Sequence, residues 1–179
     1  MNNEIATLNP FKHAPTIDIS TWYKGILSTL LATDENTGGA FDLVLAHMKC
    51  GTEPPPHVHT QESELFFVLD GAMDAYVDDK VFHVGAGECV FLPVRRPHAY
   101  IIKSPEIRVL TLLTPGGFMK AVAPMAAPAQ KMEIPSDMVT YATADLKDTM
   151  AIFMKHGLRF LSPEEIAHQM PAFPVRVAA

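Results

Sequence analysis

The chain has 179 residues and 48% of them are hydrophobic, which fills one core and leaves no room for a second catalytic domain. Its formal net charge is -6, with acidic and basic residues scattered along the sequence, so we expect no nucleic acid partner. No apolar run approaches the roughly 20 residues of a membrane span, and residues 1–10 do not resemble a signal peptide, so we expect a cytoplasmic protein with no membrane partner.

Residues 22–113 alternate short apolar runs with glycine, proline and acidic turn residues, which is typical of an all-β domain. Two strands are predicted at residues 22–32 and 41–48, joined as a hairpin because the segment between them is dense in turn-forming residues. Six further strands are expected at residues 65–69, 72–77, 81–84, 89–92, 98–102 and 108–113. Eight short strands with closely spaced turns favour a double-sheet jelly roll.

The composition changes after residue 117. Residues 121–129 are rich in proline and alanine and poor in β-formers, so we expect a linker or covering arm there, without a strand. Leu146, Met150 and Phe153 recur at helical spacing and predict a helix over residues 145–156, which Gly157 is placed to end. A second short helix is expected to begin at Ser162, because proline and two glutamates follow this N-cap residue.

These patterns divide the chain into an N-terminal arm (1–21), a barrel (22–118) and a C-terminal arm with one or two helices (119–179). Residues 22–32 and the apolar face of the helix at 146–153 carry more apolar side chains than one small barrel needs to cover itself. We therefore expect a homodimer, with packing inside the monomer as the competing account.

The first group of chemically informative residues is His57, His59 and Glu64, framed by Gly51 and Gly71. In an extended strand, residues two apart face the same side, so both imidazoles are expected to point into the barrel. Glu64 begins the next strand after a short turn, and the antiparallel return brings its carboxylate beside the histidines.

A fourth candidate ligand is His98, which follows Gly87 and Pro93 at regular spacings of five and four intervening residues. Three imidazoles and one carboxylate suit iron, manganese, nickel, cobalt, copper or zinc, and the ligand set alone does not choose among these metals. We expect one divalent transition metal ion per chain.

Other candidate residues are given no role in the centre. Glu62 is an alternative to Glu64 as ligand, but the spacing favours Glu64, and Glu62 is expected to face solvent. The pair Arg95 and Arg96 is a candidate for binding an acidic substrate, although charged pairs in turns are usually solvated. Two cysteines are too few for a disulfide framework, so we expect buried free thiols, with a single bridge between them as the alternative: Cys50 and Cys89.

The spacings of both motifs resemble those of cupins, especially single-domain proteins similar to quercetin 2,3-dioxygenase, and the resemblance covers residues 22–118. Two positions depart from the cupin pattern: Arg95 stands where glycine is usual, and Ile102 where asparagine is frequent. The resemblance implies a double-stranded β-helix barrel that holds its metal ion with His57, His59, Glu64 and His98.

The same resemblance implies a metal-dependent dioxygenase acting on a flavonol-like or other enolisable aromatic compound, with a small-molecule substrate and dioxygen as its partners. Because cupins serve many chemistries, two alternatives stay open. One is an isomerase or decarboxylase that uses no oxygen, and the other is a non-catalytic cupin that binds a small molecule.

The pocket is predicted from strand parity. If Glu64 and His98 point inward, the residues two and four positions further along each strand point inward as well: Phe66, Val68, Tyr100 and Ile102. Each of these side chains has core packing as its alternative role. Residues 118–119 are expected either to close the pocket as a lid or to begin the C-terminal arm.

Glu64 is predicted to have a second role as catalytic base. An enol or phenol must lose its proton to bind a metal ion as an anion, and Glu64 is the carboxylate of the motif that is placed to accept that proton.

Overall fold

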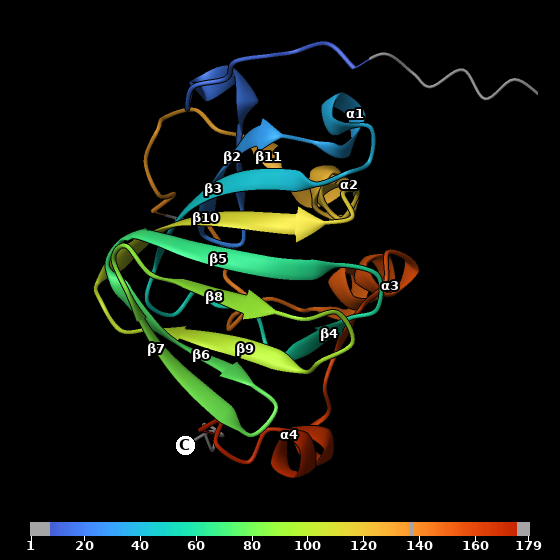
Figure 1. Ribbon diagram of the computed structural model, residues 1–179. Coiled ribbons are helices and arrows are strands. Elements are labelled where there is room, and N and C mark those ends of the chain that lie inside the picture. Colours follow the sequence, from blue (N-terminus) through green and yellow to red (C-terminus); the bar gives the residue numbers. More distant parts are fainter. Residues whose placement is uncertain (1–7, 137, 175–179) are drawn as a thin grey trace, which may run out of the picture.

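The computed structural model describes residues 8–136 and 138–174, which form two antiparallel sheets and a few short helices (Figure 1). The larger sheet has the strand order β11-β1-β2-β3-β10-β5-β8, and the smaller has the order β12-β4-β9-β6-β7. The predicted all-β jelly roll is therefore confirmed.

The strands of the larger sheet are β1 (Ser20–Tyr23), β2 (Ile26–Ala32), β3 (Asp42–Lys49), β5 (Ser63–Asp70), β8 (Cys89–Leu92), β10 (Glu106–Thr114) and β11 (Ala127–Pro128). Those of the smaller sheet are β4 (His57–His59), β6 (Ala72–Val77), β7 (Lys80–Gly85), β9 (His98–Ile102) and β12 (Leu158–Phe160). The helices are η1 (Ile17–Ile19), α1 (Asp34–Thr37), α2 (Met119–Val122), η2 (Ala123–Met125), α3 (Lys147–Lys155) and α4 (Pro163–Gln169).

The hairpin formed by β2 and β3 is confirmed, with Thr29 opposite Leu45 in antiparallel register. The prediction of a single strand over residues 22–32 was wrong, because a tight turn divides this segment into β1 and β2. Lys24 and Gly25 both have positive φ, at 50° and 84°. Two consecutive left-handed residues form the kind of turn that joins adjacent antiparallel strands.

The C-terminal arm contributes strands that the sequence did not predict. Residues 121–129 were expected to contain no strand, yet β11 pairs with the edge of β1. Proline is tolerated in an edge strand, because the hydrogen bond that it cannot donate is not needed inside the sheet. Residues with low intrinsic β-propensity can also form a strand when they pair with an existing sheet edge. Strand β12 likewise pairs with β4.

Both predicted helices are confirmed. Helix α3 is followed by Gly157, whose φ of 82° ends the helical path. Helix α4 begins with a reciprocal capping box, in which Ser162 Oγ accepts from the Glu165 backbone amide at 3.2 Å and the Glu165 carboxylate accepts from the Ser162 amide at 2.8 Å. Within the described part of the chain, no helix is long and apolar enough to cross a membrane.

The apolar interior is divided between the barrel and the C-terminal arm. One cluster fills the space between the two sheets and includes Val68, Met73 and Ile102. A second lies where α2, α3 and β12 meet the barrel, and includes Phe153 and Leu158. This second cluster matters for function because it covers the strand that carries two of the candidate metal ligands.

The two cysteines are free thiols, as expected, but their predicted burial was wrong. Cys50 and Cys89 are both exposed. Cys89 lies opposite Phe67 on the outer face of the larger sheet, because residues at alternate positions of β8 point away from the barrel.

Candidate metal centre

Three strands bring the four predicted ligands together. His57 and His59 lie at the two ends of β4, Glu64 lies near the start of β5, and His98 opens β9 directly opposite His57. All four side chains are buried, and their ligand atoms lie within 4.8 Å of one another. The structure thus collects in one place the residues that the sequence motifs contain.

The ligand atoms that face the common point are three imidazole Nε2 atoms and one carboxylate. The Nε2 atom of His98 lies 3.1 Å from Nε2 of His57 and 3.3 Å from Oε2 of Glu64. The Nε2 atom of His59 lies 3.7 Å from Oε1 of Glu64. At most one of the two facing nitrogens of His57 and His98 can carry a proton, because two N–H groups cannot donate to each other.

The opposite ring nitrogens are each held by an acceptor. Nδ1 of His57 donates to the Pro55 carbonyl at 2.8 Å, and Nδ1 of His98 donates to the Arg96 carbonyl at 3.0 Å. Nδ1 of His59 donates to a carboxylate oxygen of Glu62 at 3.2 Å. These acceptors assign the proton to Nδ1 in all three rings and leave Nε2 for a metal ion. The donor set therefore fits a divalent transition metal.

Electrostatics keep the ligands in forms that bind cations. Burial lowers the pKa of His57 well below its usual value, and the neighbouring charges of His98 and His59 lower it further. Burial raises the pKa of Glu64, but the charge of His59 and the hydrogen bond and charge of His98 outweigh this effect and lower it to about 2. Glu64 is thus a carboxylate at neutral pH, and His57 is neutral, which are the forms of these two side chains that bind a metal ion.

Glu62 was expected to face solvent, and that prediction was wrong. Glu62 is only 4% exposed. Its carboxylate contacts Nδ1 of His59, on the side of the ring away from Nε2, and is not one of the four ligand groups. The turn between β4 and β5 brings it there, because residues three apart in a tight turn can fold back on one another. A carboxylate three residues after a ligand histidine was the available sequence signal.

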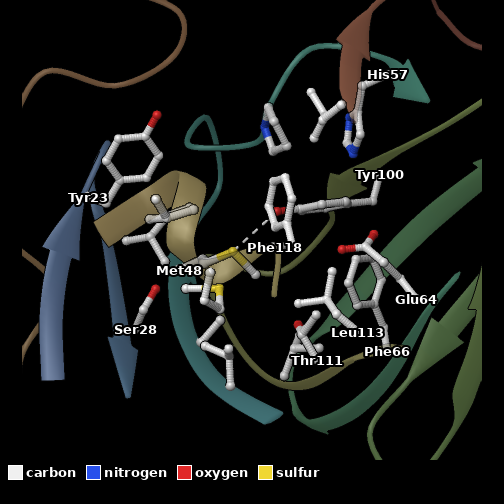
Figure 2. A pocket seen from close by; sticks show the side chains of 18 of the residues that line it. Tyr23, Ser28, Met48, His57, Glu64, Phe66, Tyr100, Thr111, Leu113 and Phe118 are labelled. Carbon is white, nitrogen blue, oxygen red and sulfur yellow. Dashed lines mark hydrogen bonds between the residues drawn. The ribbon is translucent and has the colours of Figure 1, made fainter. Parts of the chain in front are cut away.

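A cavity of about 130 Å³ adjoins the centre, and Figure 2 shows Glu64 and Phe66 on one side of it with Tyr23 and Ser28 on the other. Two of the four predicted pocket residues, Phe66 and Tyr100, line this cavity, and their rings meet edge to face at 5.4 Å.

The other two predicted pocket residues, Val68 and Ile102, are 0% and 2% exposed and belong to the packed core; neither is among the residues that line the cavity. The inward-facing rows of β5 and β9 start at the ligands Glu64 and His98. Farther along these rows, side chains fill the barrel interior.

Much of the cavity wall comes from residues that the sequence analysis missed. Tyr141, Phe153, Leu158 and Phe160 line it from the C-terminal arm. Phe118, from the segment proposed as a lid or the beginning of this arm, is 8% exposed and lies edge-on against the His59 ring at 4.6 Å. The three-residue strand with Leu158 and Phe160 is too short to show periodicity, and the helical spacing that includes Phe153 does not reveal what the helix packs against.

The two arginines have structural partners. Arg95 adopts a positive φ of 63°, which explains why cupins usually have glycine at this position, and its backbone amide donates to the His59 carbonyl at 2.7 Å. Arg96 Nε donates to the half-buried carboxylate of Asp78 at 2.6 Å. Neither side chain lines the cavity that adjoins the metal centre.

Comparison with known proteins agrees with the fold. Residues 44–114 match the family described as the cupin domain. The matched residues include His57, His59, Glu64 and His98, and the two-sheet barrel around them has the jelly-roll fold of a cupin domain.

Among individual proteins, the chain is 27% identical over 109 residues to quercetin 2,3-dioxygenase of Bacillus subtilis strain 168. This match covers 61% of the chain but only 32% of the relative, so the chain spans about a third of that protein's length. Among solved structures, it resembles Pac13, a nucleoside dehydratase from Streptomyces, with a TM-score of 0.50 and 14% identity over 69% of this chain and 95% of that one. KdgF from Halomonas sp. superposes with a TM-score of 0.48 and 19% identity over 53% of this chain and 84% of that one.

Proposed function

We propose that this protein is a metal-dependent dioxygenase that acts on a flavonol-like or other enolisable aromatic compound. The observation that carries the proposal is the position of the His57, His59, Glu64 and His98 centre at the wall of a cavity lined mainly by aromatic and aliphatic side chains. The similarity to quercetin 2,3-dioxygenase supports this choice of reaction.

Under this proposal the four ligands hold one ion of iron, manganese, nickel, cobalt, copper or zinc. Such an ion supplies Lewis acidity that stabilises an enolate oxygen and, where the metal is redox-active, a route for electrons to dioxygen. The chain's own residues bind the substrate, orient it and accept its proton.

Aromatic walls favour a flat substrate. Phe66 and Tyr100 stand edge to face beside Glu64, and Phe118 covers the His59 ring. Rings of this kind bind another aromatic surface and exclude water, which strengthens electrostatic interactions at the centre.

Two polar groups are placed to act on an enolic substrate. Glu64 is the only acidic residue among the described residues that line the cavity, so its carboxylate is the proposed acceptor for the enol proton. Burial raises the pKa of Tyr100 far above its usual value, and the charges of Glu53 and Glu64 raise it further, which keeps the phenol protonated. Its hydroxyl now donates to Met48 Sδ at 3.3 Å, a weak acceptor that a substrate carbonyl can replace (Figure 2).

An oxygen-uptake experiment tests the proposed reaction. The protein is loaded anaerobically with each candidate metal and mixed with flavonols, and matched flavones that lack the enolic hydroxyl serve as controls. We expect dioxygen and flavonol to disappear together, while the flavones persist. Conversion without oxygen uptake would instead indicate the isomerase or decarboxylase alternative, and a ligand that raises Tm but is never converted would indicate a binding protein.

We also propose a homodimer. The apolar face of α3, from which the sequence predicted a dimer, gives little support, because Phe153 is buried within its own chain. The outer face of the larger sheet gives better support, since Leu110 pairs with Leu45 and Phe67, and Phe67 and Phe91 are 37% and 54% exposed. Exposed aromatic side chains on the outer face of a sheet suit contact with a second copy of the chain.

Light scattering at micromolar concentration tests the dimer. We expect a mass near twice the 19.6 kDa of one chain, and the Phe91→Glu variant is expected to shift it toward one chain. A mass near 19.6 kDa for the unaltered protein would refute the proposal.

A further inference from the structure

We propose that Glu62 is a positioning residue of the metal centre, which holds His59 in its ligating orientation and strengthens it as a ligand. This inference rests on the proposed metal centre and not on the identity of the substrate. It concerns a residue that lies outside the group of four ligand atoms.

The first support is the contact between Glu62 and His59. The carboxylate lies 3.2 Å from Nδ1 of His59, and the two side chains are 5% and 1% exposed. Phe118 covers the same imidazole ring from another side. The ring is thus held by a hydrogen bond and an aromatic contact, which fixes the direction in which its Nε2 points.

The second support is an asymmetry among the three histidines. Nδ1 of His57 and of His98 donates to a backbone carbonyl, whereas Nδ1 of His59 donates to a carboxylate. A negatively charged acceptor draws the Nδ1 proton more strongly than a carbonyl does and increases electron density at Nε2. His59 is therefore expected to be the strongest imidazole donor of the three.

The third support is the charge around the centre. Glu62 and Glu64 are both buried, and within the described residues their only ion-pair partners are His59 and His98. Burying two carboxylates is costly unless positive charge accompanies them. One divalent cation at the Nε2 atoms carries the charge that two carboxylates require.

The test measures metal affinity without using activity. Glu62→Gln retains an oxygen acceptor of similar size but removes the charge, and Glu62→Met removes both. Dissociation constants for Zn²⁺ and Co²⁺ are measured by competition with a chelator, after circular dichroism has shown that each variant is folded. The matched control is Glu106→Gln. It alters another histidine–glutamate pair, away from the centre, in which the Glu106 carboxylate lies 2.9 Å from Nε2 of His47.

We expect a roughly 10- to 100-fold loss of affinity in Glu62→Met, the range typical for carboxylates that support metal-binding histidines, and a smaller loss in Glu62→Gln. The visible absorption spectrum of the Co²⁺ complex should shift in both variants, while Glu106→Gln should match the unaltered protein. Affinities within twofold of the unaltered protein in both Glu62 variants would overturn the proposal.

A measurement on the unaltered protein keeps the proposal testable if the variants do not fold. In the Zn²⁺-loaded protein, the Nδ1 proton of His59 should resonate downfield of those of His57 and His98 in nitrogen-proton NMR spectra, because its acceptor is charged. Equal shifts for the three protons would overturn the role of Glu62 while leaving the metal centre intact. Failure of the unaltered protein to bind any metal would overturn both.

Discussion

Phe160 lies directly opposite His57 in the antiparallel ladder between β12 and β4, and the centroids of the two rings are 6.3 Å apart. A strand from the C-terminal arm therefore extends the sheet that carries three of the four candidate metal ligands. The same arm supplies the carbonyl of Gly157, which accepts hydrogen bonds from the Thr60 amide at 2.7 Å and the Thr60 hydroxyl at 2.9 Å. The arm thus supports the turn that contains Glu62.

Packing of the C-terminal arm is predicted to depend on Phe153. This side chain is 2% exposed and packs in the cluster between α3 and the barrel, so Phe153→Ala should lower the free energy of unfolding by about 3–5 kcal/mol. Met154 is its neighbour on the same helix but is 64% exposed, so Met154→Ala should change stability by less than about 0.5 kcal/mol. Urea denaturation of both variants is the measurement, and equal losses would contradict the packing described.

Metal content is predicted to depend on the buried histidines and not on exposed ones. The unaltered protein should bind about one ion per chain, and His98→Ala should retain much less, because it removes one of four convergent ligands. His83→Ala is the control, since the His83 side chain is 83% exposed and its pair with Asp74, at 2.6 Å, lies outside the group of four ligands. Elemental analysis after reconstitution and dialysis decides, and full occupancy in His98→Ala would exclude His98 as a ligand.

The sequence predicted much of the fold because alternation and turn chemistry act locally. Strands at residues 72–77, 89–92 and 98–102 coincide with β6, β8 and β9. The motif spacing likewise contained all four residues of the buried group. The expected pairing of Glu64's strand with the histidine strand was wrong, because β5 lies in the larger sheet, whereas β4 and β9 are paired neighbours in the smaller one.

The remaining features depend on contacts between distant residues. The turn at Lys24 and Gly25 was missed because lysine is an uncommon residue at positive φ. Strands β11 and β12 exist because the edges of β1 and β4 recruit them, and no short sequence pattern encodes such recruitment. The burial of Glu62 was missed for a related reason, since it depends on how the turn after β4 folds back on His59.

Acidification is predicted to release the metal. Protons compete with the ion for the Nε2 atoms, so the dissociation constant should rise as the pH falls below the histidine pKa values. Because burial and the charges of His98 and His59 place the pKa of His57 well below 6.5, His57 stays neutral to a lower pH than a free histidine. Retention of metal should therefore extend to a lower pH than for a flexible peptide with the same ligands, as chelator competition between pH 8 and pH 5 can measure. Affinity independent of pH over this range would contradict imidazole ligation.

The proposed base role of Glu64 predicts a specific effect of Glu64→Gln. The amide keeps a carbonyl oxygen and a similar volume but cannot accept the proton of an enol, so turnover per bound metal should fall by about 10²-fold or more. Metal content is measured in the same samples, so that weaker ligation is separated from slower chemistry. The unaltered carboxylate has a pKa of about 2, which makes it a weak base until substrate binding loosens it from the centre and the apolar cavity raises its proton affinity.

Raising the pH provides the decisive arm of this experiment. Above the pKa of the substrate hydroxyl, the enolate is already formed and needs no base, so the rate of Glu64→Gln per bound metal should recover toward that of the unaltered protein. Glu106→Gln, whose carboxylate lies in an exposed pair with His47, should keep the unaltered pH profile. Full activity of Glu64→Gln per bound metal at neutral pH would eliminate the base role. A deficit that persists unchanged at high pH would show that Glu64 contributes through ligation and orientation instead of proton transfer.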